Sequence, residues 1–235
     1  ELVTCKGSAP KHGKEMSDIG LIKDGAVIIH DDKIVAVGTT EELDKQINDE
    51  YEVIDATGKT VMPGFVDSHT HFIFGGYRAD EFSWRLKGDS YMSIMERGGG
   101  INATVVPTRE ASLEELMETG EERLNRMLEF GVTTVEGKSG YGMDCETELK
   151  MLRAMKNLNE KHPVDIVSTF LGPHSVLPEW KGKEKEFLDE QLNHVMPIVK
   201  EEGLAEFADI FTEKNVFSVE DSEYYMTKQK KWDSS

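Results

Sequence analysis

Two histidines separated by one residue, His69 and His71, follow an apolar run and precede Gly75 and Gly76. In a β-strand, residues i and i+2 point to the same face, so both imidazoles would project together from the end of the strand. Imidazole nitrogens are common ligands of divalent metal ions. A surface pair would have the same spacing, but the Pro-Gly before the strand and the glycines after it favour a buried pair. The pattern therefore predicts that His69 and His71 bind one metal ion.

An arginine follows the histidine pair where the chain leaves the predicted strand. The planar guanidinium of Arg78 could bind a carboxylate through two parallel hydrogen bonds, which would suit a small acidic ligand. A second interpretation stays open, because Asp80 and Glu81 lie beside it and a solvated ion pair would show the same composition.

Tyr141 and His174 follow two later predicted strands. Tyr141 lies between Gly140 and Gly142, where its hydroxyl could donate to a ligand or its ring could simply cover the rim of the fold. His174 follows Gly-Pro; its imidazole could bond a carbonyl oxygen and stabilise developing charge, although a lone histidine there is more often an ordinary loop residue. The remaining histidines receive no role: His12, His30, His162 and His194.

Residues 1–61 are predicted to form a small β-rich subdomain. In the stretch 25–38, two β-branched runs surround Asp31 and Asp32, which predicts a hairpin that turns at these residues. The stretch 51–65 repeats this pattern, with a strand through Val53 and Ile54, a turn, and a strand ending at Pro63 and Gly64. Such a region is too small to fold alone.

Residues 62–235 alternate between strands and helices. Ser112 and Glu115 form a capping box for one helix, and a later helix is predicted to be interrupted before Pro197. Strands separated by helices indicate a parallel sheet, either doubly wound or closed into a barrel. Four units are found where a closed barrel has eight, which indicates half a barrel or an open sheet. The predicted strands are 65–74, 130–139, 164–172 and 206–213.

The composition argues against large anionic partners. Lys and Arg total 27 against 45 Asp and Glu, a formal net charge of −18 that repels nucleic acid and anionic membranes. No run reaches the roughly 18 apolar residues of a membrane span, and the first residues lack the apolar core of a secretory signal. Cys5 and Cys145 are too few for a disulfide framework. We therefore expect a cytoplasmic protein that acts on a small molecule, without nucleic-acid or membrane partners.

These motifs resemble a known group of enzymes. VMPGFVDSHTH is similar to the first barrel strand of the amidohydrolase superfamily. HTHFIFGGYRADEF, RGGGI, KSGYGMD and STFLGPH together resemble its imidazolonepropionase family, over the chain up to about Phe217. The resemblance implies an α/β fold: the first half of a TIM-type (β/α) barrel, behind a small N-terminal sheet. It also implies a hydrolase of histidine degradation that opens 4-imidazolone-5-propanoate to N-formimidoyl-L-glutamate with one divalent metal ion, zinc or iron.

The resemblance also implies roles for individual residues. His69 and His71 would bind the metal ion, and Arg78, Tyr141 and His174 would contact the substrate, with His174 also acting in catalysis. Some superfamily members bridge two metal ions with a carboxylated lysine on the fourth strand. Lys138 lies on the second predicted strand instead, so one ion is expected.

The glycine-rich stretch RGGGI, residues 97–101, could bind a phosphate if it began a helix. The pattern places it after a helix instead, so we expect a loop over the pocket.

The chain lacks several residues that the family uses to bind its metal ion. A third metal histidine, an adjacent glutamate and a metal aspartate belong to later barrel strands that have no counterpart here, so we expect the chain alone to be inactive. Two alternatives stay open: another cyclic-amide hydrolase or deaminase of the superfamily, or a non-catalytic module that pairs with a second chain. The resemblance leaves a homodimer of the full-length form open as well.

Overall fold

The computed structural model describes residues 1–90, 93–94, 97–214 and 216–233. The chain divides into two compact units, Glu1–Gly64 and Phe65–Ser235. The sequence predicted this boundary three residues earlier, between residues 61 and 62. Within the described ranges, no helix combines the length and the apolar character needed to cross a membrane.

The first unit contains two antiparallel strand pairs. The predicted hairpin is present: its strands pair from Gly25 with Thr39 to His30 with Lys33, and Asp31 takes a left-handed conformation with φ of 54° in the turn. The short helix α1 begins with a capping box between Thr39 and Glu42. The strands are β1 (Leu2–Val3), β2 (Leu21–Ile22), β3 (Gly25–His30) and β4 (Lys33–Thr39), and the helices are η1 (Gly13–Ser17), α1 (Thr40–Leu43) and η2 (Asp44–Gln46).

The predicted strand through Val53 and Ile54 is wrong. Residues 52–56 have no regular structure, and the two side chains are 72% and 84% exposed. Of the second predicted strand, Val61 forms only an isolated parallel bridge with Leu2. β-Branched residues favour a pleated, half-buried surface, but a strand also needs a neighbour for its backbone hydrogen bonds, and Val53 and Ile54 have none among the residues that the structure describes.

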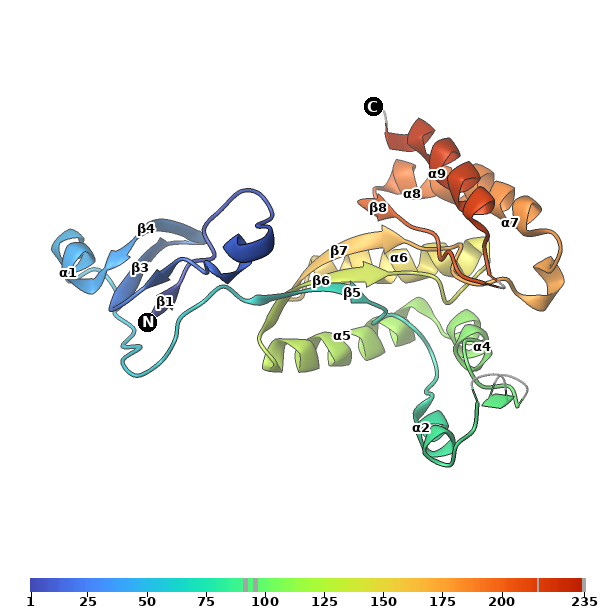
Figure 1. Ribbon diagram of the computed structural model, residues 1–235, viewed down its shortest axis with the longest axis horizontal. Helices are drawn as coiled ribbons and strands as arrows, with labels where there is room; N and C mark the ends of the chain where they lie inside the picture. Colours follow the sequence, from blue (N-terminus) through green and yellow to red (C-terminus); the bar gives the residue numbers. More distant parts are fainter. Residues whose placement is uncertain (91–92, 95–96, 215, 234–235) are drawn as a thin grey trace. The chain divides into compact units, whose positions relative to one another are not determined.

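The second unit is built on a parallel sheet whose strands follow one another in the order β5-β6-β7-β8, as the sequence predicted (Figure 1). The last strand is shorter than expected, because beyond Ala208 only single backbone bonds continue the pairing, such as Asp209 N–H to the carbonyl of Phe170. The strands are β5 (Phe65–Thr70), β6 (Val132–Lys138), β7 (Asp165–Phe170) and β8 (Phe207–Ala208).

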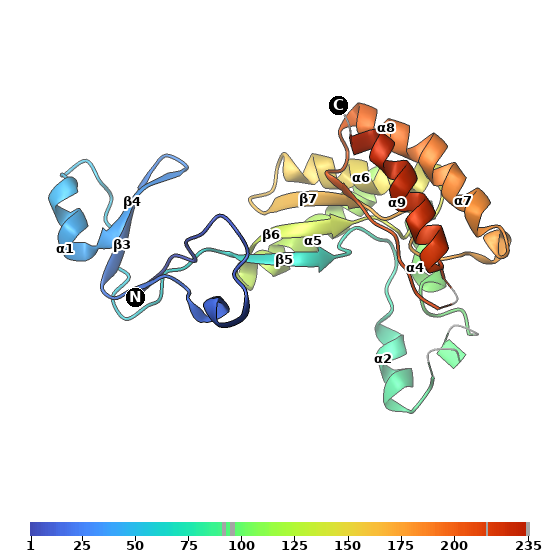
Figure 2. The ribbon, with the colours of Figure 1, turned by 45° about the horizontal axis from the view of Figure 1, so that its top comes forward.

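Helices connect these strands and pack on the sheet. Helix α5 has the predicted capping box between Ser112 and Glu115, and α5 and α6 lie side by side along the sheet (Figure 1). The predicted interruption before Pro197 is a π-turn, η4, and α9 packs along this broken helix (Figure 2). The helices are α2 (Ala79–Leu86), α4 (Asn102–Glu110), α5 (Leu113–Glu129), α6 (Cys145–Asn159), η3 (Pro178–Trp180), α7 (Glu184–Glu190), η4 (Gln191–Val195), α8 (Met196–Glu202) and α9 (Val219–Asp233).

The core of this unit lies between the sheet and its helices. Leu124 of α5, Leu152 of α6 and Phe170 of β7 are fully buried in one apolar cluster. Each such side chain stabilises the fold by about 1.5 to 3 kcal/mol. Gly137 lets the chain beyond β5 come close, because a Cβ there would lie 2.7 Å from the ring of Phe72. The core thereby fixes the ends of β5, β6 and β7, from which the candidate site is built.

Candidate active site

Four aromatic side chains meet at or just beyond the carboxyl ends of β5, β6 and β7. The ring centroids of His69 and His71 are 5.7 Å apart, so the two imidazoles lie on one side of the chain. The ring of His174 stacks on His71 at 4.7 Å with an interplanar angle of 5°. Tyr141 contacts both, at 5.0 Å from His71 and 5.4 Å from His174. Side chains from the ends of three different strands thus form one cluster.

His71 lies inside this cluster, and its Nδ1 atom is buried without a hydrogen-bond partner among the residues that the structure describes. Burial, together with the nearby charges of His174, His69 and Lys138, lowers the pKa of His71 to about 3. The ring is therefore neutral near pH 7. A neutral imidazole offers the lone pair that a metal ion requires.

The two histidines can serve as a pair of metal ligands but do not complete a site. Two imidazoles that share one zinc ion, with Zn–N distances of about 2.1 Å, have ring centroids about 5 to 6 Å apart, which agrees with the separation here. Yet over the described ranges no group of three or more His, Cys, Asp or Glu side chains could hold a metal ion. Because catalytic zinc normally has three protein ligands, His69 and His71 could supply only part of such a set.

His174 is held in one tautomer by the backbone. Its Nδ1 lies 2.9 Å from the carbonyl oxygen of Gly140, and since a carbonyl can only accept, Nδ1 carries the proton. Burial lowers the pKa of His174, although the bond to Gly140 opposes this shift. A neutral ring in this tautomer presents Nε2 as a hydrogen-bond acceptor. The geometry thus favours a bond from a ligand N–H over the bond to a carbonyl oxygen considered from the sequence.

Arg78 has an internal carboxylate as its partner. Its Nε and Nη2 donate to the two carboxylate oxygens of Glu81 at 3.0 and 2.9 Å. This bond and the N–H of Gly100 hold the pKa of the Glu81 carboxyl below its usual range, although burial opposes them. The ion pair weighed from the sequence is therefore formed, in a partly buried setting. Contact of Arg78 with a substrate stays a prediction.

The glycine-rich stretch 97–101 follows residues 93 and 94, which are helical as predicted, but the expectation that it does not precede a helix is wrong. Helix α4 begins at Asn102, directly after this stretch. The N–H of Gly100 donates to Glu81 at 2.6 Å. An internal carboxylate thus occupies the N-terminal end of this helix, where an anion is favoured.

Lys138 projects from the end of β6 as a cation. Its Nζ lies 2.7 Å from Glu136 and 3.1 Å from Asp209. Burial lowers the pKa of Lys138, but the hydrogen bonds to the two carboxylates outweigh it, so the net shift is upward. Carboxylation requires a neutral amine, which this ion-pair network disfavours.

Comparison with known proteins agrees with the resemblance found in the sequence motifs. The profile of the Amidohydrolase family matches residues 52–99. The chain is 55% identical over 224 residues to the imidazolonepropionase of Parabacteroides distasonis, an alignment covering 95% of this chain and 54% of the relative. It is 50% identical to the imidazolonepropionase of Clostridium tetani, covering 98% of this chain and 55% of the relative. The chain belongs to the imidazolonepropionase family. It spans about half the length of the curated relatives it matches.

Solved structures support the fold of this imidazolonepropionase-family chain. Escherichia coli guanine deaminase matches with a TM-score of 0.57 and 17% identity, covering 99% of this chain and 50% of that one. An atrazine chlorohydrolase from Arthrobacter aurescens complexed with zinc matches with a TM-score of 0.50 and 17% identity, over 90% and 47% of the two chains. At this identity the likeness concerns the fold alone.

The structure adds two residues that sequence reasoning missed in this imidazolonepropionase relative. Arg123 of α5 donates to the carbonyls of Phe72 and Phe74 at 2.7 and 2.9 Å and lies over the ring of Phe74, so it fixes the chain just after His71. Glu148 of α6 is fully buried against the loop that carries Tyr141. Neither residue lies near a strand end in sequence, and each reaches the site through backbone atoms.

Proposed function

We propose that this chain forms part of the active site of an imidazolonepropionase, a hydrolase that opens the ring of 4-imidazolone-5-propanoate to N-formimidoyl-L-glutamate in histidine degradation. The observation that carries the proposal is the placement of His69, His71, Tyr141 and His174 in one cluster at the ends of three adjacent parallel strands. Parallel α/β folds bind their ligands at this edge. The names of the relatives support the substrate.

The four parallel strands are proposed to be the first half of a TIM-type (β/α) barrel. The similarity to guanine deaminase, which extends over nearly all of this chain and half of that one, supports this arrangement. In such a barrel the residues that follow each strand converge at one rim. Ligands contributed by later strands would therefore meet His69 and His71 at the same place.

His69 and His71 are proposed to hold one divalent ion, zinc or iron. When bound, such an ion polarises a carbonyl and lowers the pKa of a coordinated water toward neutrality, which makes hydrolysis of a cyclic amide feasible near pH 7. The zinc in the structure of the atrazine chlorohydrolase with a similar fold supports this choice. The low pKa of His71 keeps its lone pair available over the whole neutral range.

The other residues are proposed to bind and orient the substrate. The Nε2 of His174 can accept a hydrogen bond from a ring N–H, because its Nδ1 proton is bonded to Gly140. The hydroxyl of Tyr141 can donate to the ring carbonyl. Arg78 can bind the propanoate, and its pairing with Glu81 fixes the guanidinium.

Zinc titration of the purified chain, followed by NMR of the histidine rings, tests the metal site. We expect zinc to shift the ring signals of His69 and His71 together, and either His69→Ala or His71→Ala to weaken zinc binding at least about tenfold, because each removes one of two ligands. His194→Gln is the matched control, since this ring is 64% exposed on the broken helix. Zinc shifts that persist unchanged in both alanine variants would refute the site.

The chain by itself is expected to show no measurable ring opening. Two imidazoles hold a catalytic ion poorly, and the described residues contain no third ligand near them. Incubation of the metal-loaded chain with 4-imidazolone-5-propanoate, with product measured as N-formimidoyl-glutamate, checks this expectation. Turnover at a rate typical of enzymes, about 1 to 1,000 per second, would contradict it.

A further inference from the structure

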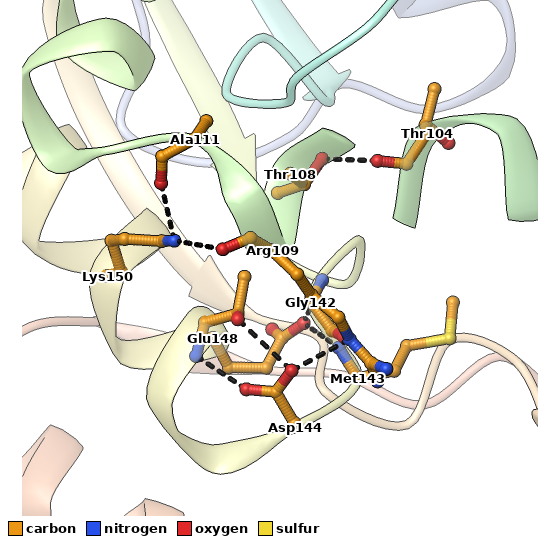
Figure 3. Close-up of polar contacts among 10 residues, drawn as sticks. Thr104, Thr108, Arg109, Ala111, Gly142, Met143, Asp144, Glu148 and Lys150 are labelled. Carbon is orange, nitrogen blue, oxygen red and sulfur yellow. Dashed lines mark hydrogen bonds and ion pairs between the residues drawn. The ribbon is translucent and has the colours of Figure 1, made fainter. Parts of the chain in front are cut away.

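Glu148 is a buried acid that the proposed chemistry does not use. It lies in the first turns of α6 and has no exposed surface. Its two oxygens accept the backbone N–H groups of Gly140, Gly142 and Met143, at 2.9, 2.8 and 2.8 Å. Figure 3 shows the carboxylate facing the loop at Gly142 and Met143. The loop residues on either side of Tyr141 are thus bonded to one carboxylate.

The contact continues from Glu148 to His174. Gly140 donates its N–H to Glu148 and accepts the Nδ1 proton of His174 on its carbonyl oxygen. The hydroxyl of Ser139 also accepts the N–H of Leu171, which lies shortly before His174 in sequence. The same loop therefore carries Tyr141 and sets the tautomer of His174.

Side chains of neighbouring helices also form hydrogen bonds around this loop. Arg109 of α4 donates to the carbonyl of Gly142 at 2.7 Å and pairs with Asp144 at 2.8 Å (Figure 3). Lys150 of α6 donates to the carbonyls of Arg109 and Ala111 at 2.9 and 2.6 Å, which satisfies the end of α4. Residues of both α4 and α6 therefore hold this loop by hydrogen bonds.

Burying a carboxylate at this position costs free energy, which argues that Glu148 has a specific role. Burial raises the pKa of the Glu148 carboxyl, while hydrogen bonds from Ser139 and from the loop N–H groups oppose the shift. Burying a charge in the interior is unfavourable unless its oxygens are satisfied. A glutamine would fill the same volume without charge, but its NH₂ group cannot accept an N–H, so it would leave part of the loop unbonded.

We propose that Glu148 is a positioning residue that shapes the loop 139–143 and, through Gly140, orients Tyr141 and His174 against the metal-binding histidines. Its consequence for catalysis rests on the proposed function. The effect of Glu148 on the loop and on the rings of Tyr141 and His174 does not depend on the proposed function.

The test compares Glu148→Gln with Glu146→Gln, an exposed acid in the first turn of the same helix. In the unmodified chain, hydrogen exchange should show protected amides at Gly140, Gly142 and Met143, and ¹⁵N NMR should show His174 as a single Nδ1–H tautomer. In Glu148→Gln we expect at least tenfold faster exchange at Gly140 and a mixed His174 tautomer. Glu146→Gln should leave both unchanged.

Unprotected loop amides in the unmodified chain, or a single Nδ1–H tautomer in a folded Glu148→Gln variant, would overturn the proposal. If Glu148→Gln does not fold, Glu148→Asp takes its place, because it keeps the charge but withdraws the carboxylate by about 1.5 Å. In that variant, unchanged NMR signals of the His174 ring together with loss of protection at these amides would overturn the proposal. Zinc titration distinguishes failure of this proposal from failure of the proposed function. If zinc does not bind but the His174 tautomer still changes in the Glu148 variant, only the proposed function fails.

Discussion

Replacing Gly140 with alanine should destabilise the second unit by about 2 to 4 kcal/mol and displace the ring of His174. Gly140 has φ of 106°, a conformation that residues with a Cβ rarely adopt. An added Cβ would lie 2.6 Å from the carbonyl oxygen of Leu171 and 2.9 Å from Nδ1 of His174. The first contact is with backbone and cannot be relieved by a side-chain rotation. The second falls on the hydrogen bond that fixes His174.

Gly182→Ala separates backbone strain from this overlap. Gly182 also has positive φ, at 80°, but no atom lies within 4 Å of an added Cβ, so only the strain of about 1 to 2 kcal/mol is expected there. Urea unfolding followed by tryptophan fluorescence measures both variants in the second unit, because Trp84, Trp180 and Trp232 all belong to it. Equal losses in the two variants, with an unchanged His174 signal, would contradict the overlap at Gly140.

The predicted site residues that follow strands came together because strand geometry is local. The two-residue period places His69 and His71 on one side of the chain, and parallel strands bring Tyr141 and His174 to the same edge. Arg78 and Glu81 are three residues apart at the start of α2, a spacing that predicts their contact, and the sequence offered that pair as an alternative. What it could not decide is whether this pair is solvated or partly buried.

Glu148 could not be found in the same way. In the sequence it is one of several charged residues in the first turns of a helix, where acids favour the positive end of the helix dipole. Its burial depends on how the loop before α6 folds back, with Gly140 and Met143 both at positive φ. Likewise, Val53 and Ile54 carried a strand pattern without a partner strand, and pairing is decided by distant segments. Local periodicity predicts elements, whereas contacts through backbone atoms require the tertiary structure.

Lowering the pH from 6.5 to 5 should reduce the contribution of His71 to the stability of the metal-free second unit by up to about 1.4 kcal/mol per pH unit, which amounts to roughly 1.6 kcal/mol over this range. Burial lowers the pKa of His71 from 6.5 to about 3 in the folded chain. Between these values the unfolded chain binds a proton that the folded chain does not. The stability due to neutral His71 is therefore complete above pH 6.5 and is lost as the pH falls toward 3. The pKa of His174 is lowered too, so its contribution has the same sign.

The slope of unfolding free energy against pH isolates this effect, because glutamine does not titrate. His71→Gln should flatten the slope between pH 6.5 and 5 by about one proton, whatever it does to absolute stability, and His194→Gln, at an exposed ring, is the control variant. A chelator must be present throughout, since a metal ion competes with protons for the same imidazole lone pairs. The range stops at pH 5 because carboxyls held below their usual pKa, such as Glu81, begin to contribute below it. Identical slopes in the two variants would mean that His71 is hydrated in the folded chain, and the buried neutral ligand proposed here would then be wrong.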